Sequence, residues 1–168
     1  MIIRNFIQSE ETELRRVFTS SVHKLARDFY TPEQLNAWAP AAYDQEKWAN
    51  KIATLRPFVA TVEGRVVGYA DLQDSGYIDH FFVSGEFSGR GIGKALMRHL
   101  HEVATKRELL ELSAHVSLSA ELFFTRHGFQ VDERQAVVVM GVSMANSRMS
   151  KGLMANSSFK PKPLRGSA

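Results

Sequence analysis

Three closely spaced glycines stand where an apolar segment of the chain gives way to an amphipathic one. The stretch FFVSGEFSGRGIGKALM places Gly89, Gly91 and Gly93 at alternate positions, accompanied by Arg90 and Lys94. Without side chains there, several backbone N–H groups at the start of a helix can converge on one point, where the helix dipole favours negative charge. The stretch therefore predicts a site for a small anionic group such as a pyrophosphate.

Other interpretations of the glycine loop fit the sequence less well. A Walker A loop needs a glycine separated by four residues from its Gly-Lys element, but Ser88 stands there, and Ala95 replaces the magnesium-binding hydroxyl. A Rossmann fingerprint needs a further glycine where Lys94 stands. A tight strand-to-helix turn without a ligand needs only one or two glycines. The pattern favours a pyrophosphate cradle of another kind.

The glycine loop needs a strand before it and a helix after it, and the apolar pattern predicts both. Apolar residues mark residues 76–83 as a strand, and they recur at helical spacing from Ile92 onward. The sequence TPEQ at Thr31 predicts a helix start with a capping box, and Ser9 is expected to cap an earlier helix. The other expected strands are residues 1–7, 58–62, 66–72, 109–116 and 129–144.

These elements predict the order β-α-α-β-β-β-α-β-α-β-β, with a further short helix at residues 44–52. Such an order is typical of an α/β (α+β) domain with a mixed sheet that carries helices on both faces. Residues 1–144 are expected to form this domain. Residues 145–168 are expected to be a C-terminal extension that is partly disordered, because the end of the chain is rich in proline and charge.

The composition excludes several other classes of function. The 168 residues suffice for one domain with a hydrophobic core, and the absence of cysteine excludes disulfides, thiolate metal sites and cysteine nucleophiles. No metal is expected. A net charge of +3 does not require a nucleic-acid partner, and no segment approaches the roughly 18 apolar residues of a membrane span. We therefore expect a cytoplasmic protein that binds neither nucleic acid nor a membrane.

Two motifs in register resemble the GNAT superfamily of N-acetyltransferases. The run SGRGIG at residues 88–93, after FFV, resembles the family's motif A, Gln/Arg-x-x-Gly-x-Gly/Ala. The run SLSAELFFTRHGF at residues 117–129 resembles motif B, Asn-x-x-Ala-x-x-Phe-Tyr-x-x-x-Gly-Phe. The resemblance covers residues 1–144, and motif B together with Arg134 and Gln135 is most similar to the small bacterial YafP-type subgroup. It implies a mixed, mostly antiparallel sheet and acetyl-CoA as co-substrate.

The resemblance also implies how the co-substrate is held. Backbone amides of residues 89–94 would hold the pyrophosphate, and the strand before the loop would pair with the pantetheine arm as an added strand would. A backbone N–H of that strand would face the thioester oxygen and stabilise the oxyanion. The cofactor-side residues implied are Phe81, Phe82, Val83, Ser88, Gly89, Arg90, Gly91, Ile92, Gly93, Lys94, Ser117 and Phe124.

The sequence departs from the family pattern at three of these positions. Ser88 replaces the usual Gln or Arg, which weakens one side-chain contact to phosphate, and Ser117 stands where Asn is common. Phe124 replaces a Tyr that often donates a proton or hydrogen bond to the departing thiolate. A thiol with a pKa of about 8.5 needs limited acid help to leave at neutral pH, so Phe124 is compatible with transfer.

The reaction implied by the resemblance is acyl transfer to a nucleophile, usually an amine, and a base or a water relay must take up a proton. Side chains alternate along a strand, which puts Tyr77 and Asp79 on one face and His80 on the other. In several family members the base occupies positions that correspond to Asp79 or Tyr77. Asp79 is the first candidate, and His115 on the next strand is another. The alternative for Asp79 is a hydrogen-bonded or solvated strand carboxylate, and His80 is interpreted as structural.

The early helices usually shape the acceptor site in this family, so Tyr30 and Trp38 are candidates for its walls, with plain packing as the alternative for Trp38. We expect an acetyl-CoA-dependent N-acetyltransferase that acts directly on a primary amine of a small molecule or of a protein or peptide, since no cysteine can carry an acetyl group. The alternative is an acyl-CoA-binding GNAT module with weak or no catalysis, which Phe124 favours. A homodimer through the edge of the C-terminal strands is also open.

Overall fold

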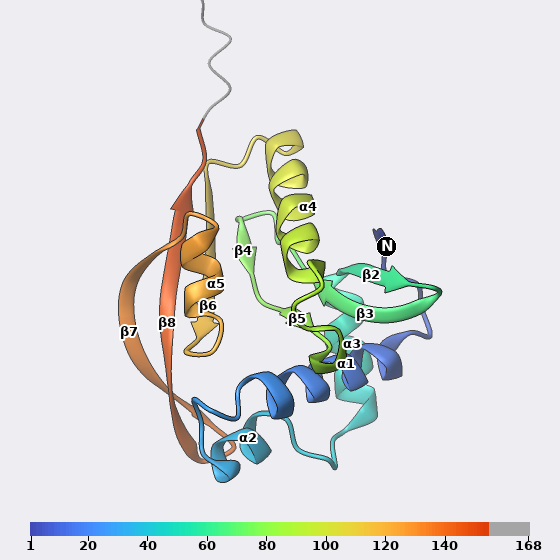
Figure 1. Ribbon diagram of the computed structural model, residues 1–168, viewed down its shortest axis with the longest axis vertical. Coiled ribbons are helices and arrows are strands. Elements are labelled where there is room, and N and C mark those ends of the chain that lie inside the picture. Colours follow the sequence, from blue (N-terminus) through green and yellow to red (C-terminus); the bar gives the residue numbers. More distant parts are fainter. Residues whose placement is uncertain (155–168) are drawn as a thin grey trace, which may run out of the picture.

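Two four-stranded sheets stand side by side in the computed structural model, which describes residues 1–154 (Figure 1). The N-terminal elements are β1 (Ile2–Asn5), α1 (Glu11–Leu25), α2 (Pro32–Trp38), α3 (Gln45–Leu55), β2 (Phe58–Val62), β3 (Arg65–Ala70), β4 (Tyr77–Ile78) and β5 (Phe81–Val83). The others are the 3-10 turn η1 (Gly85–Phe87), α4 (Ile92–Lys106), β6 (Glu111–Ser117), α5 (Glu121–Arg126), β7 (Gln130–Val139) and β8 (Val142–Gly152).

The sheets are mixed and mostly antiparallel, which confirms the expected fold class. The first has the order β1-β2-β3-β5 and is antiparallel throughout. The second has the order β4-β6-β8-β7, in which only the pairing of β4 with β6 is parallel. The predicted element order is reproduced together with the further short helix before β2, except that the strand expected at residues 76–83 is divided between the two sheets.

Helices cover both faces of the first sheet, because alternate strand residues feed two hydrophobic clusters. Ala60 and Ala70 belong to a cluster with Leu96 and Leu100 of α4. Their chain neighbours, such as Tyr69, point the other way and pack with Leu14, Phe18 and other residues of α1–α3. The helix α4, which follows the glycine loop, therefore packs on one face of the sheet, while α1–α3 form a separate hydrophobic cluster on the other.

A buried carboxylate causes the division of the strand at residues 76–83. Asp71 is fully buried, and its Oδ1 accepts hydrogen bonds from the backbone N–H groups of Asp79 at 2.9 Å and His80 at 2.7 Å. These two N–H groups therefore do not bond to a neighbouring strand, and the segment divides there: β4 joins β6 while β5 stays with β3. The regular alternation of side chains is lost there. The prediction that Asp79 and His80 face opposite ways is therefore wrong, and both line the same pocket.

The helix starts were predicted with mixed success. The capping box at Thr31 is confirmed, since Thr31 Oγ1 accepts from Gln34 N–H and Gln34 Oε1 accepts from Thr31 N–H. The cap at Ser9 is wrong: Ser9 has a φ of +87°, and the Glu10 carboxylate instead accepts from the N–H of Ile7 and pairs with Arg4. The short third helix is longer than expected and is capped by Asp44, whose Oδ1 accepts from the N–H of Lys47.

The expected domain end at residue 144 is too early. The strand β8 continues to Gly152 and lies between β6 and β7, so residues 146–150 pair on both sides within the sheet. Ser147 and Met149 are fully buried there. The rest of the predicted extension, from residue 155, lies outside the described residues. Within residues 1–154, none of the helices combines the length and the hydropathy needed to span a bilayer.

We predict that Asp71→Ala lowers the free energy of unfolding by about 2–4 kcal/mol, because two buried N–H groups lose their acceptor. Asp71→Asn, the matched control, keeps an acceptor oxygen and should cost much less.

Burial raises the pKa of Asp71 above its usual value of 3.8, so the folded state holds the proton of this carboxyl group more tightly than the unfolded state. The stabilisation from that proton is complete below pH 3.8 and is lost as the pH rises through the folded-state pKa. Urea denaturation of the wild type and Asp71→Asn across that range should therefore show the wild type losing stability relative to the variant. Equal stability of all three proteins would contradict the role given to Asp71.

Candidate active site

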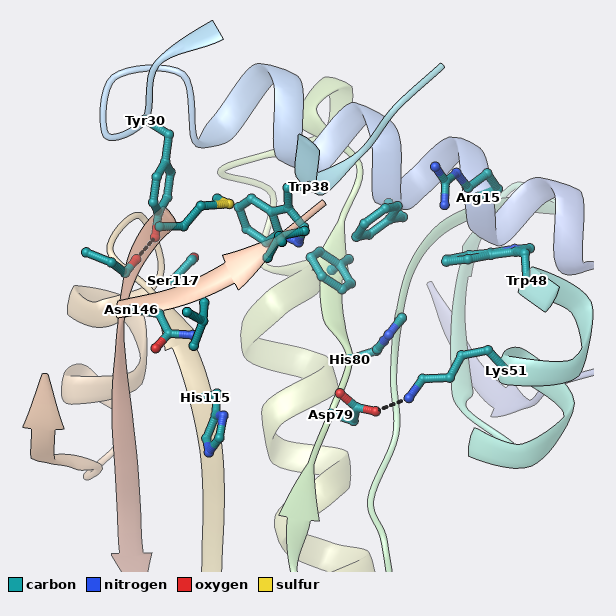
Figure 2. A pocket seen from close by; sticks show the side chains of 16 residues that line it. Arg15, Tyr30, Trp38, Trp48, Lys51, Asp79, His80, His115, Ser117 and Asn146 are labelled. Carbon is teal, nitrogen blue, oxygen red and sulfur yellow. Dashed lines mark hydrogen bonds and ion pairs between the residues drawn. The ribbon is translucent and has the colours of Figure 1, made fainter. Parts of the chain in front are cut away.

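A pocket of about 340 Å³ lies where the two sheets separate, between α1–α3 on one side and β6, β7 and β8 on the other (Figure 2). It gathers several predicted residues, namely Tyr30, Trp38, Asp79, Phe82, His115 and Ser117. The rest of its lining was not predicted and comprises Arg15, Phe18, Trp48, Lys51, His80, Val137, Val139, Met144, Ala145 and Asn146. The pocket is therefore assembled from segments far apart in the sequence around one group of aromatic rings.

His80 is a half-buried titratable group that lies among these rings. Its ring lies 6.1 Å from Phe18, 6.0 Å from Trp48 and 5.4 Å from Phe82, measured between centroids. Burial lowers its pKa to about 4, an effect that the nearby Asp79 charge opposes. The imidazole is consequently neutral at neutral pH, with one nitrogen able to accept a proton.

A tyrosine hydroxyl orients the His80 ring. Nδ1 lies 3.0 Å from the hydroxyl of Tyr69, which is fully buried and whose pKa burial raises well above 10, so it remains a phenol. Within the part of the chain that the structure describes, Nε2 has no hydrogen-bond partner. When Nδ1–H donates to the Tyr69 oxygen, the lone pair of Nε2 is left for the pocket.

Asp79 lies beside His80 and forms an ion pair with a helix residue. Its Oδ2 is 2.5 Å from Nζ of Lys51 on α3, and the two side chains are 26% and 48% exposed (Figure 2). A ligand that binds the Asp79 carboxylate must therefore share it with Lys51. This contact fits the hydrogen-bonded strand carboxylate weighed from the sequence, and it also keeps the carboxylate beside the pocket.

The other two candidate bases lie farther from the rings. Tyr77 does not line the pocket, packs edge-on against His115 at 5.6 Å between centroids, and has a pKa raised chiefly by burial. His115 is exposed and reaches the pocket from β6. The catalytic roles of both residues stay predictions.

Tyr30 and Trp38 both line the pocket as expected, but the hydroxyl of Tyr30 is already occupied. It donates to the carbonyl of Ala145 at 2.6 Å and accepts from the N–H of Leu118 at 2.9 Å. Tyr30 therefore joins the loop before α2 to both β6 and β8 and offers the pocket its ring. Trp38 packs against Tyr30 and Phe18, at centroid distances of 5.8 Å and 6.5 Å.

The glycine loop lies at the other end of β5 from the pocket. Gly89 and Gly91 have φ values of +76° and +79°, which L side chains rarely adopt, and a Cβ at either position would meet no atom within 4 Å. Gly91 is the N-cap of α4, so free N–H groups of the first turn point out here. A neighbouring groove is lined by four cationic side chains, Lys94, Arg98, Arg126 and Lys151. The loop has the open backbone and the positive charge that a pyrophosphate needs.

The strand that joins the loop to the pocket has one free edge. β5 is the last strand of its sheet, paired with β3 on one side and facing the gap between the sheets on the other. Its unpaired backbone groups can therefore pair with an extended ligand. At the far side of the gap, Ser117 lines the pocket and its hydroxyl lies 2.9 Å from that of Ser119.

Phe124 is buried, with 4% of its surface exposed, and packs against Phe81, Phe123 and Phe129 at centroid distances of 5.7, 5.8 and 5.0 Å. A hydroxyl group on that ring would enter an apolar cluster, where an unsatisfied polar group is costly. The missing hydroxyl is therefore consistent with the packing of this side chain.

One unpredicted lining residue had a recognisable signal in the sequence. Arg15 shares a helix face with Phe18 and Val22 at spacings of three and seven residues, so it stands at a core position of α1. A charged residue on an apolar face marks a functional or strongly paired group. Lys51 and Asn146 had no such signal, because their place depends on tertiary contacts.

Comparisons with known proteins identify the class of fold and then the family. A solved structure of a GCN5-related N-acetyltransferase from Rhodopseudomonas palustris has a TM-score of 0.86 and 32% identity, covering 90% of this chain and 95% of that one. The PaiA N-acetyltransferase of Thermoplasma acidophilum, solved with coenzyme A, has the same fold, with a TM-score of 0.72, 18% identity and coverage of 90% and 98%. The molecule thus has the fold of an N-acetyltransferase.

The model of the acetyltransferase (GNAT) domain matches residues 26–151. The uncharacterized N-acetyltransferase YafP of Escherichia coli K12 is 32% identical over 147 residues, which cover 88% of this chain and 93% of that protein. The chain belongs to the GNAT family of acetyltransferases, and the resemblance read from its two motifs is confirmed.

We predict that Tyr30→Phe destabilises the protein by about 1–3 kcal/mol, because the N–H of Leu118 and the carbonyl of Ala145 both lose a buried partner. Tyr43→Phe is the matched control, since among residues 1–154 no side-chain hydrogen bond involves its hydroxyl. Thermal unfolding of both variants measures the difference. Equal melting temperatures would show that Tyr30 does not tie the early helices to the second sheet.

Proposed function

We propose that this protein transfers the acetyl group of acetyl-CoA directly to a primary amine, which enters the pocket beside His80. The observation that carries the proposal is the free edge of β5. One end of β5 leads into the glycine loop, where a pyrophosphate fits, and the other end leads to His80, which lines the pocket together with Phe82. A cofactor arm along β5 and an amine in the pocket would therefore meet beside His80.

The residues present fit acetyl-CoA. Left-handed Gly89 and Gly91 leave space for phosphate oxygens, Arg90 and Lys94 supply positive charge, and the edge of β5 can pair with amide groups of the pantetheine arm. Bound acetyl-CoA would supply the thioester. A backbone N–H of residues 81–83 would donate to the developing oxyanion. Solved relatives that carry acetyl-CoA, such as the phosphinothricin acetyltransferase of Sinorhizobium meliloti, agree with this use of the fold.

His80 is the proposed base. In the transfer, a bond forms between the amine nitrogen and the acetyl carbon, the carbon–sulfur bond breaks, and its electron pair leaves with sulfur. Nε2 of His80 takes the proton from nitrogen, and Nδ1–H then donates to the oxygen of Tyr69. Because the pKa of His80 is about 4, the protonated ring readily gives this proton up. The neighbouring carboxylate of Asp79, which is partly exposed, would pass it to solvent. No cysteine is present to hold the acetyl group, which favours direct attack.

A second candidate function is an acyl-CoA-binding module with weak or no catalysis. The observation in its favour is Phe124, whose buried ring cannot protonate the leaving thiolate. A thiol with an ordinary pKa of about 8.5 leaves without strong acid help, so we favour the enzyme. Tight binding of acetyl-CoA without release of free CoA in the presence of any amine would decide for the module.

We predict that acetyl-CoA raises the melting temperature and that Gly91→Val abolishes this rise, because the side chain occupies the space of a phosphate oxygen. Gly64→Val is the matched control, since Gly64 has nearly the same φ, +76°, and equally open surroundings in the hairpin turn. Both variants carry a similar backbone strain of about 1–2 kcal/mol. A rise in all three proteins would exclude the glycine loop as the pyrophosphate site.

We further predict that His80→Gln lowers kcat by about 10²- to 10⁴-fold and leaves the acetyl-CoA melting shift intact. Asp79→Asn should reduce kcat less, since Asp79 only receives the proton from His80. Because His80 must be neutral to act, the contribution of His80 in the free enzyme to kcat/KM should be lost only as the pH drops toward about 4. A larger loss for Asp79→Asn would make Asp79 the base, as the sequence alone suggested. Tyr77→Phe and His115→Gln in the same series test the remaining candidates.

A further inference from the structure

A buried arginine lines the proposed acceptor pocket without an acidic partner. Arg15 on α1 is 8% exposed, and its Nε is buried without a hydrogen bond. Its only hydrogen bond in the described part of the chain runs from Nη2 to the carbonyl of Pro40 at 2.9 Å. None of the ion pairs among residues 1–154 includes it. A guanidinium in such a place is costly unless another group balances its charge.

Aromatic rings balance part of that charge. The guanidinium carbon lies 4.0 Å from the ring centroid of Tyr43, 4.9 Å from that of Trp48 and 5.0 Å from that of Phe18. Such contacts favour a cation, but each contributes only about 0.5–2 kcal/mol. Burial lowers the pKa of Arg15, because the guanidinium has lost much of its hydration. A cation held this way still attracts an anion.

The remaining charges of the pocket do not supply that anion. Among the described residues that line the pocket, Asp79 is the only carboxylate and already pairs with Lys51, while His80 is neutral. The lining therefore carries an excess positive charge, which disfavours an acceptor with several ammonium groups. Figure 2 shows Arg15 on α1 beside Trp48, with His80 and then Asp79 below them in the view.

The pocket walls between Arg15 and His80 indicate the chemical character and the size of the rest of the acceptor. Phe18 and Trp48 each contact both the guanidinium and the His80 ring, so an apolar or aromatic body between an amine and an anionic group would lie against them. A volume of about 340 Å³ suits a molecule of the size of an amino acid or a dipeptide.

We propose that Arg15 selects acceptor amines that carry a carboxylate, of which an apolar or aromatic amino acid, free or at the end of a short peptide, is the matching class. The inference rests on the proposed function, because it concerns the acceptor of the same reaction. The amine would lie at His80 and the carboxylate at the free edge of the Arg15 guanidinium.

Matched acceptors test this selectivity. The wild type should acetylate L-phenylalanine with a kcat/KM about tenfold or more above that for L-phenylalaninamide and 2-phenylethylamine, which lack the charge. A dipeptide with C-terminal phenylalanine distinguishes a peptide from a free amino acid, and spermidine serves as the polycation. Similar kcat/KM values for acceptors with and without a carboxylate, or a preference for spermidine, would overturn the inference.

Variants connect the selectivity to the residue. Arg15→Gln should remove the preference by lowering kcat/KM for the carboxylate acceptors alone, and Arg15→Lys should keep part of it. Arg16→Gln is the control, because it removes the same charge from the exposed neighbouring position of α1. A loss that is equal for charged and uncharged acceptors would mean that Arg15 only supports the helix packing. If Arg15→Gln does not fold, Arg15→Lys and the wild-type acceptor pairs decide.

A binding measurement separates this inference from the proposed function. In the presence of CoA, N-acetyl-L-phenylalanine should raise the melting temperature of the wild type more than its amide does, and Arg15→Gln should remove that difference. If no amine is acetylated but this difference is present, the transferase proposal fails and the anion site stands. If amines are acetylated without this difference, the anion site fails and the transferase proposal stands.

Discussion

The hydrogen bonds of one buried carboxylate set the geometry on which the site depends. Asp71 accepts from two consecutive backbone N–H groups, those of Asp79 and His80, at the point where a single strand would otherwise continue. A strand paired normally along residues 77–83 would hold the two sheets together and close the gap between them. Because the carboxylate takes these N–H groups, one half of the strand follows the second sheet and the other half stays with the first.

This one break has two consequences that a catalytic site needs at the same place. It leaves β5 with a free edge next to the gap, which is a backbone template for an extended ligand. It also turns two consecutive titratable side chains toward one pocket, which a regular strand does not allow. The proposed ligand path and the proposed proton-handling groups therefore arise together, and α4 and α1 only have to hold the two halves in position.

Local signals in the sequence predicted the parts of the molecule that local physics determines. The glycine loop depends on φ values that only glycine adopts easily, and the capping box at Thr31 depends on four consecutive residues, so both could be recognised directly. The side of the strand toward which His80 points could not be predicted. Its cause is the carboxylate of Asp71, which lies nine residues earlier and belongs to no recognisable motif. The end of the domain was misjudged since the residues after Met144 are polar, yet they pair on both sides as β8. Arg15 stood at a core position of its helix, but only the folded protein reveals the missing acid.

The buried polar groups around the pocket are better explained by reaction chemistry than by stability. Burial lowers the pKa of both His80 and Arg15, because it disfavours the charged form of each side chain. Each of them therefore gives less stability than an apolar side chain could give at the same place. If an acceptor carboxylate binds at Arg15, it balances that charge and brings a negative charge near the rings that separate Arg15 from His80. A negative charge there favours the protonated imidazole and raises the pKa of His80 toward the range in which a base works best. On this argument the acceptor itself strengthens the base, so that the ring is a poor proton acceptor in the empty pocket and a better one when the correct amine is present.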